Sequence, residues 1–458
     1  MSRLWKKSVA LLAVMIVITG TLAACGSAGN NEQADTTKQS TSGNASTTNT
    51  SQNESESDKP YEGTEIRFIM ATHPWLDTIK TMIPEFEEQT GIKVHVESYN
   101  QEQTSQKISV ELVGKSSSLD VIFIRPLDET KLFGRNGWLE PLDSYFANDV
   151  EYDLNDFIPS SLDTSTYEGQ LLGIPITTER EILYYRKDLF EQHGIEVPKT
   201  MEEMMAAAEK LTDPDNNMYG FVARGRKNVA VTQFAGYLFS FGGQFQDGDT
   251  ATLNTPEAIA AYQYYGEMLS KYGPPGVVNM HWPEAAAAFA QGQVAMYTDA
   301  DAIYLNVADP SKSAVSDKVG YALFPAGPAG AKPYNVSSGA LAVSKFSENK
   351  EAAVEFIKWA TSKEMVLRTQ SAGNPGARQS VWSNPESTKN YPPELVEVIN
   401  QTSEIGVGID RPQVINVGEA RDIISEPITA AIMGMDIQAA ADKAQQAFQE
   451  LIDKENEK

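Results

Sequence analysis

Residues 65–70 read EIRFIM and residues 120–124 read DVIFI, two short apolar segments that frame the start of the folded region. Between them, residues 75–91 carry apolar side chains at helical spacing and end at a glycine. Residues 92–96 then alternate as a second strand, and residues 103–113 form a second helical pattern. Short apolar strands that alternate with helices predict a parallel sheet covered by helices on both faces.

Polar and aromatic residues follow two of these strands. Ligands of such sheets bind beyond the carboxyl ends of the strands. Trp75 follows the first strand, and Arg125 and Asp128 follow the third, so we expect all three near a binding site. Trp75 also fits the apolar stripe of its own helix, and both charged residues also fit an exposed loop.

The predicted folded region, residues 61–458, has about 400 residues, which is too many for one ordinary hydrophobic core. We therefore expect a second α/β region after the first. Residues 181–185 read as a strand, Thr200 and Glu203 have capping-box spacing, and Thr255-Pro256 opens a further helix. Four more helices are predicted at 348–360, 392–402, 418–433 and 436–452. Two α/β lobes with a ligand cleft between them follow from this pattern.

The N-terminus has the pattern of an export signal. Three basic residues precede an apolar run over 9–24, which is shorter than the roughly 20 residues that span a bilayer. The run ends in Leu22-Ala23-Ala24-Cys25, which resembles the bacterial lipobox and predicts a lipoprotein signal peptide at 1–24 with lipidation of Cys25. Cys25 is the only cysteine, so an intramolecular disulfide is excluded. An uncleaved anchor is the alternative.

The segment after Cys25 is polar and the rest of the chain is acidic. Residues 25–60 are mostly Ser, Thr, Asn, Gln and Gly and predict a disordered linker. The chain has a formal charge of −25, and its first 60 residues are balanced, so the excess belongs to residues 61–458. Such acidity argues against nucleic acid as a partner and against a basic membrane-binding face.

Catalytic and metal motifs are not evident. The four histidines are scattered, and residues 220–227 depart from a phosphate-binding loop at its Lys and Ser/Thr positions. Glu179 with Glu181, or Asp299 with Asp301, resembles a glycosidase pair only in residue type. Such a pair must flank the scissile bond and usually comes from separate elements. We expect no catalytic residue, no cofactor and no metal.

Four short blocks carry a family resemblance. They read FEEQTGIKV at 86–94, LYYRKDLF at 183–190 with GIEVPKT at 194–200, FAQGQVAM at 289–296, and AAVEFIKWA at 352–360. In this order they resemble extracellular solute-binding proteins of family 1, the maltose-binding-like group, over roughly residues 61–450. The segments at 224–226, 271–276 and 317–321 look closest to the polyol-binding branch, whereas residues 296–300 lack the Trp that is common there.

The resemblance implies a two-lobe α/β fold of the periplasmic-binding-protein type II class. The chain would cross between lobes near residues 175, 326 and 370. The N-terminal lobe would then comprise 61–176 and 326–370, and the C-terminal lobe 177–325 and 371–458. It also implies a monomeric, non-enzymatic ABC-importer protein that is anchored by lipid on the extracytoplasmic face. Such a protein closes on a sugar or polyol by hinge motion and delivers it to the permease.

The chemistry of a polyol guides the choice of site residues. Buried hydroxyls need hydrogen-bond partners, carboxylates accept from vicinal hydroxyls, and aromatic faces cover the C–H surface. The expected contacts at strand ends and lobe crossings are Trp75, Gln103, Arg125, Asp128, Thr178, Glu179, Arg224, Asp299, Asp301, Tyr334, Asn335, Ser337, Asn374 and Arg378.

Three other classes of protein stay open at this point. A secreted glycoside hydrolase would share the anchor, the acidity and the aromatic residues. An adhesive lipoprotein would bind no small solute. A binding protein for a peptide, a metal or another non-carbohydrate solute would share the fold.

Overall fold

The computed structural model describes residues 59, 61–147 and 149–457. The predicted signal segment, Cys25 and nearly all of the predicted linker lie outside these residues. The described part of the chain contains no helix long and apolar enough to cross a membrane.

The strands form one extended path in which two sheets share a long strand. The order is β2-β1-β3-β12-β6-β10-β7, and β11 also pairs with β6. The strands are β1 (Glu65–Ala71), β2 (Lys93–Tyr99), β3 (Val121–Ile124), β6 (Ile174–Arg186), β7 (Tyr219–Val222), β10 (Val294–Ala300), β11 (Val319–Leu323) and β12 (Asn335–Val343). Two short hairpins, β4–β5 (Thr166–Tyr167 and Gln170–Leu171) and β8–β9 (Gln246–Asp247 and Thr250–Ala251), stand apart from this path.

Strand direction shows how the two sheets are joined. β1 is parallel to both β2 and β3, and β10 is parallel to β7. The first part of β6 pairs antiparallel with β12, and its second part pairs antiparallel with β10 and β11. β6 therefore leaves one sheet and enters the other, and the sheets are mixed rather than wholly parallel.

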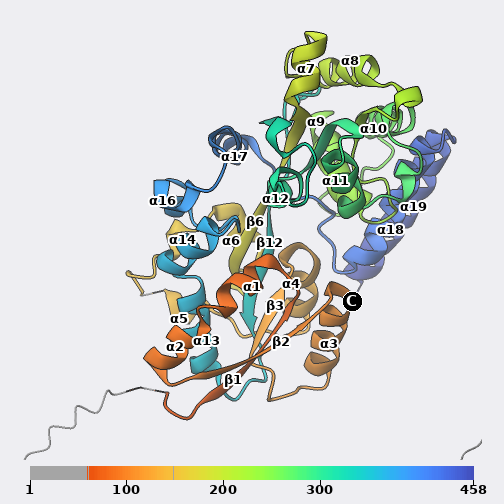
Figure 1. Ribbon diagram of the computed structural model, residues 1–458. Helices are drawn as coiled ribbons and strands as arrows, with labels where there is room; N and C mark the ends of the chain where they lie inside the picture. Colours follow the sequence, from red (N-terminus) through yellow and green to blue (C-terminus); the bar gives the residue numbers. More distant parts are fainter. Residues whose placement is uncertain (1–58, 60, 148, 458) are drawn as a thin grey trace, which may run out of the picture. The chain divides into compact units, whose positions relative to one another are not determined.

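Helices cover both sheets (Figure 1). Those of the first lobe are α1 (Pro74–Lys80), α2 (Ile83–Thr90), α3 (Gln101–Val113), α4 (Pro126–Arg135), α5 (Asp143–Phe146), α6 (Pro159–Thr164), α13 (Lys350–Ala360) and α14 (Lys363–Ser371). The remaining helices are α7 (Lys187–His193), α8 (Met201–Leu211), α9 (Ala230–Ser240), α10 (Pro256–Tyr272), α11 (Trp282–Ala290), α12 (Tyr304–Ala308), α15 (Gln379–Trp382), α16 (Pro385–Thr388), α17 (Pro393–Ile405), α18 (Val417–Ile432) and α19 (Ile437–Asn456).

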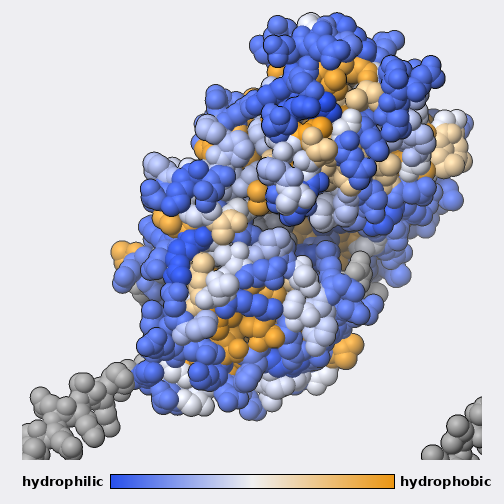
Figure 2. Space-filling view, in the orientation of Figure 1, coloured by the Kyte–Doolittle hydropathy of each residue, from blue (hydrophilic) through white to orange (hydrophobic). Residues whose placement is uncertain are grey.

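The buried cores follow the same division. One large cluster contains residues from Ile182 to Phe324 and again from Trp382 to Ile452, which we call the second lobe. Two other clusters contain residues from Ile66 to Ile176 and again from Ala340 to Ala377, the first lobe. The exact lobe boundaries remain a prediction. Hydrophilic residues cover most of the face shown in Figure 2, in keeping with the acidic composition.

One predicted helix is wrong in its extent. The sequence predicts a single helix over 75–91, whereas the structure has α1 and α2 with a break at Thr81 and Met82. The N–H groups of these two residues bond to Thr78 and Ile79, three residues back, which ends α1. Pro84 explains the break, because a proline ring clashes with the carbonyl four residues earlier in a continuous helix. Gly91 does end α2, in the left-handed conformation with φ 82°.

Candidate ligand site

A buried ion pair lies where two parallel strands end. β7 and β10 run side by side, and Arg224 follows β7 while Asp299 lies near the end of β10. The Arg224 Nε donates to Asp299 Oδ2 at 2.9 Å, and its Nη2 donates to Asp299 Oδ1. The hydroxyl of Tyr297 donates to the same carboxylate at 2.8 Å. Asp299 is fully buried and Arg224 nearly so, so this pair is shielded from bulk solvent.

A second buried pair lies beside it. Asp301 accepts from the backbone N–H of Arg180 at 2.8 Å and from its Nη1 at 3.1 Å. The Arg180 guanidinium also lies 4.9 Å from the ring centre of Trp382 and donates from Nε to Ser403 at 2.7 Å. Its Nη2 is buried without a hydrogen-bond partner among the described residues.

Glu179 faces both pairs from the crossing strand β6. Burial, together with the nearby carboxylates of Asp301, Asp299 and Asp410, raises the pKa of its carboxyl to about 7 against the opposing effect of Arg224. No hydrogen bond from a described side chain reaches the Glu179 carboxylate. A carboxyl group that titrates near neutrality and lacks a protein partner can serve a ligand as acceptor or donor.

Glu181, two residues further along β6, is fully buried. It accepts a hydrogen bond from Gln233 of α9, and its Oε2 has no partner among the described residues. Burial raises the pKa of Glu181 well above its ordinary value, and Asp299 adds to the effect. Gly236 lies so close that an added Cβ would stand 1.9 Å from Oε2, so a larger residue here would force this carboxylate to move.

Two further polar groups are buried without partners at the start of β12. The Tyr334 hydroxyl and the Asn335 Oδ1 make no hydrogen bond to a described residue. Burial raises the pKa of Tyr334, and Asp299 and Glu179 raise it further, so the hydroxyl remains a neutral donor close to these carboxylates. Unpaired buried polar atoms cost free energy and therefore mark places where a ligand or water completes the bonding.

The structure brings together six of the residues expected from the sequence: Glu179, Arg224, Asp299, Asp301, Tyr334 and Asn335. Arg180, Glu181 and Gln233 join them, and the sequence did not single them out as ligand contacts. The alternation of charge at Glu179-Arg180-Glu181 on one predicted strand was the available signal, because an isolated buried strand seldom carries three charges.

Several expected contacts are instead held by other parts of the protein. The Arg378 guanidinium donates to the carbonyls of Thr361, Asp153 and Tyr152 and pairs with Asp156 at 3.2 Å. Thr178 and Ser337 donate to the carbonyls of Gly376 and Gly339. Asn374 donates to Thr78 Oγ1 at 3.1 Å and to the carbonyl of Thr369. Trp75 is buried in the first-lobe core, and Gln103 is exposed on the first turn of α3.

Arg125 and Asp128 form a separate ionic group at the start of α4. Arg125 lies 2.7 Å from Asp128 and 3.3 Å from Glu129. Asp128 also pairs with Arg411 at 2.8 Å. Burial alone would raise the pKa of the Asp128 carboxyl, but Arg411, Arg125 and Arg421 hold it well below its ordinary value.

The described residues contain no group of three or more His, Cys, Asp or Glu side chains placed to hold a metal ion. The polar site has the groups needed to bind hydroxyls, namely carboxylate acceptors, arginine donors and a phenol.

Comparison with known proteins identifies the family. Residues 73–366 match the family described as bacterial extracellular solute-binding protein. The chain belongs to this family. The resemblance seen in the sequence blocks is thereby confirmed, and the extracytoplasmic setting is that of the family.

Relatives of this solute-binding protein include polyol binders. It is 32% identical over 290 residues to a mannitol-binding protein of Pseudomonas aeruginosa, a match that covers 61% of this chain and 65% of that protein. It is 29% identical over 345 residues to an erythritol/L-threitol-binding protein of Mycolicibacterium smegmatis, covering 70% and 72%. The match to the Pseudomonas protein therefore spans slightly less than two thirds of that relative.

Solved structures confirm the two-lobe α/β fold of this solute-binding protein. An ABC transporter solute-binding protein of Agrobacterium radiobacter in complex with ribitol is 30% identical, with a TM-score of 0.76 over 86% of this chain and 100% of that one. A second, from Agrobacterium vitis with bound D-mannitol, is 27% identical, with a TM-score of 0.71 over 86% and 98%.

Proposed function

We propose that this solute-binding protein captures a sugar or polyol for an ABC importer and delivers it to the permease. The protein is a monomeric lipoprotein, attached through Cys25 to the extracytoplasmic face of the cell membrane, and it acts as a binder rather than an enzyme. The two lobes close on the ligand by bending at the crossing segments. The relatives that bind mannitol, erythritol or ribitol support the ligand class.

The observation that carries the proposal is the polar site formed by Glu179, Asp299 and Asp301 with the unpaired Tyr334 hydroxyl and Asn335 Oδ1. A polyol presents a row of hydroxyls, each both donor and acceptor. Carboxylates accept from such groups, and the phenol donates back to them. The free hydrogen-bonding capacity of the site therefore suits a neutral, hydroxyl-rich solute.

The charges of the site disfavour an acidic ligand. Arg224 and Arg180 already pair with Asp299 and Asp301, so the positive charge of each guanidinium is already balanced by a protein carboxylate. Glu179 and Glu181 add further negative charge when they are ionised. A sugar acid would therefore bind more weakly than the matching polyol.

A thermal-shift screen of the full-length protein tests this function. D-mannitol, ribitol, erythritol and maltose are the probes, and D-gluconate is the acidic control matched in length to mannitol. A solute present at 100 times its Kd adds about 2.7 kcal/mol to the free energy of unfolding, so a binder raises the melting temperature. We expect a shift with at least one neutral probe and none with gluconate. No shift with any neutral probe, or a larger shift with gluconate, would contradict the proposal.

The lipid anchor has its own test. Incorporation of labelled palmitate is expected in the full-length chain and is expected to be lost in Cys25→Ser. Equal labelling of the two proteins would refute acylation at this position.

A further inference from the structure

Three polar residues lie on one face of α4. Asp128, Lys131 and Arg135 are spaced three and four residues apart, so they share one side of the helix. We call them the α4 stripe. Asp128 and Lys131 contact the segment after α17, and Arg135 contacts α19. Both partners belong to the second lobe, although α4 belongs to the first.

The contacts of the α4 stripe follow the helix from its start to its end. Asp128 Oδ1 accepts from Arg411 at 2.8 Å and lies 3.9 Å from Arg421 of α18. Lys131 Nζ donates to the carbonyl of Gln413 at 2.7 Å. Arg135 donates to the carbonyl of Glu455, near the end of α19, at 3.0 Å.

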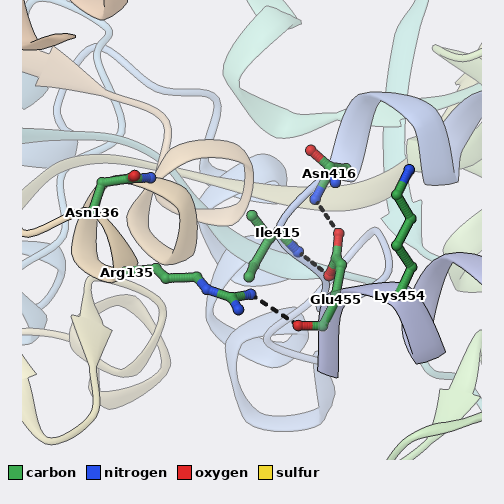
Figure 3. A pocket seen from close by; sticks show the side chains of 6 residues that line it. All are labelled: Arg135, Asn136, Ile415, Asn416, Lys454 and Glu455. Atoms are coloured by element: carbon green, nitrogen blue, oxygen red, sulfur yellow. Dashed lines mark hydrogen bonds between the residues drawn. The ribbon is translucent and has the colours of Figure 1, made fainter. Parts of the chain in front are cut away.

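The last contact crosses a cavity of about 400 Å³ (Figure 3). Arg135 and Asn136 lie on one side of it and Glu455 on the other, and the Arg135 guanidinium points across to the Glu455 carbonyl. The Glu455 carboxylate accepts from the backbone N–H groups of Ile415 and Asn416 at 2.8 and 2.7 Å. The residue that Arg135 contacts is therefore held in place by hydrogen bonds within the second lobe.

The α4 stripe is continuous with the candidate ligand site. Arg411, the partner of Asp128, also binds Asp410 at 2.6 Å and Thr232 of α9 at 3.3 Å. Asp410 is buried and acts electrostatically on Glu179. Asp410 thus couples the ionic group at the start of α4 electrostatically to Glu179 of the candidate ligand site.

The three hydrogen bonds that the α4 stripe makes to the second lobe are of a kind that can break and form again as the lobes move. All three are polar, so opening them exposes charged groups to water rather than an apolar surface. Asp128 and Arg411 have only 10% and 14% of their side chains exposed, so their attraction is screened less by salt than that of a surface pair.

We propose that the α4 stripe is a latch that holds the two lobes in their closed arrangement and thereby sets the affinity for the ligand. The predicted change in ligand affinity rests on the proposed function, whereas the predicted change in the distance between the lobes does not. Lys131 and Arg135 act only through lobe position, because both lie outside the candidate ligand site.

The distance between the lobes tests the latch without any ligand. Spin labels on Glu88→Cys of α2 and Glu209→Cys of α8, two exposed positions, report this distance in the full-length chain carrying Cys25→Ser. Lys131→Met combined with Arg135→Met removes two contacts between the lobes and keeps side-chain length. Lys363→Met combined with Arg368→Met is the matched control, because these residues pair with Asp153 and Glu85 inside the first lobe.

We expect the ligand-free latch variant to show longer and broader label distances than the parent and the control. We also expect a Kd about tenfold higher in the latch variant for whichever of D-mannitol, ribitol, erythritol or maltose binds the parent, because the competent arrangement is less populated.

Label distances equal to those of the parent would overturn the latch. A lower Kd in the latch variant would overturn it as well, because the contacts would then belong to the ligand-free arrangement. If none of the four solutes binds the parent, the proposed function fails, and the label distances still decide the latch.

Discussion

Glu179 is the residue at which stability and ligand binding conflict most directly. Its folded-state pKa of about 7 lies above the ordinary value of 4.5, so between these pH values the native state binds more protons than the unfolded state. Stability therefore falls as pH rises through this window, and the loss is complete above pH 7. The shift corresponds to about 3 kcal/mol.

We predict that Glu179→Gln stabilises the protein above pH 7 and weakens ligand binding. The amide cannot ionise, so urea unfolding at pH 8 should show a gain of up to about 3 kcal/mol, which disappears below pH 4.5. Glu88→Gln, an exposed carboxylate on α2, is the control and should change neither property. A gain of the same size at pH 4 and pH 8 would show that burial of the charge is not the cause.

Arg378 allows a test between a structural and a ligand-binding role. Its guanidinium is buried, serves four protein acceptors and lies 4.1 Å from the ring centre of Phe157. We predict that Arg378→Lys lowers the free energy of unfolding by about 3 kcal/mol, because an ammonium cannot reproduce the planar fork and leaves carbonyls unpaired. Ligand Kd should stay the same. A raised Kd with unchanged stability would instead support the ligand contact expected from the sequence.

At the scale of one helix, α8 begins with a capping box that the sequence shows in full. The Thr200 side chain accepts from the N–H of Glu203 at 3.1 Å, and Glu203 Oε2 accepts from the N–H groups of Thr200 and Lys199. We predict that Thr200→Ala costs about 1 kcal/mol in urea unfolding, whereas Thr200→Ser, which keeps the acceptor, costs much less. Equal losses in both variants would point to the methyl group rather than the cap.

Elements of this kind were predictable because their signals are local. The Thr200–Glu203 box, the Thr255 cap of α10 and the apolar strand β3 are confirmed at or near the expected residues. The break between α1 and α2 was missed because the prediction followed the apolar spacing of residues 75–86 alone and left Pro84 out of account.

The site was predictable only in part, because its contacts join distant segments. Asp301 and Arg180 lie 121 residues apart, and Asp128 and Arg411 lie 283 apart. Chemistry and strand ends suggested Asp299 and Asp301 as site residues. No local pattern showed that Arg180 would face Asp301, or that the α4 stripe would meet the segment after α17.

On the scale of the whole molecule, the two lobes have separate hydrophobic cores and share the long strand β6, whose first part pairs with β12. The register of these strands shifts between Ser337 and Ala340, beside Gly339, where an added Cβ would stand 2.4 Å from the ring of Phe123. An irregular register weakens the ladder locally. This irregular part of the ladder is therefore where we expect the strands to bend in the proposed hinge motion.

We predict that a saturating ligand contracts the protein, because a solute that contacts both lobes favours the closed arrangement. Small-angle X-ray scattering of the full-length chain should show a smaller radius of gyration with a neutral solute that passes the thermal-shift screen, and no change with D-gluconate at the same concentration. Glu179→Gln should contract only at higher ligand concentration, in proportion to its raised Kd. A radius of gyration that stays constant while the melting temperature rises would mean that the ligand enters a site already closed, and the hinge motion would have to be abandoned.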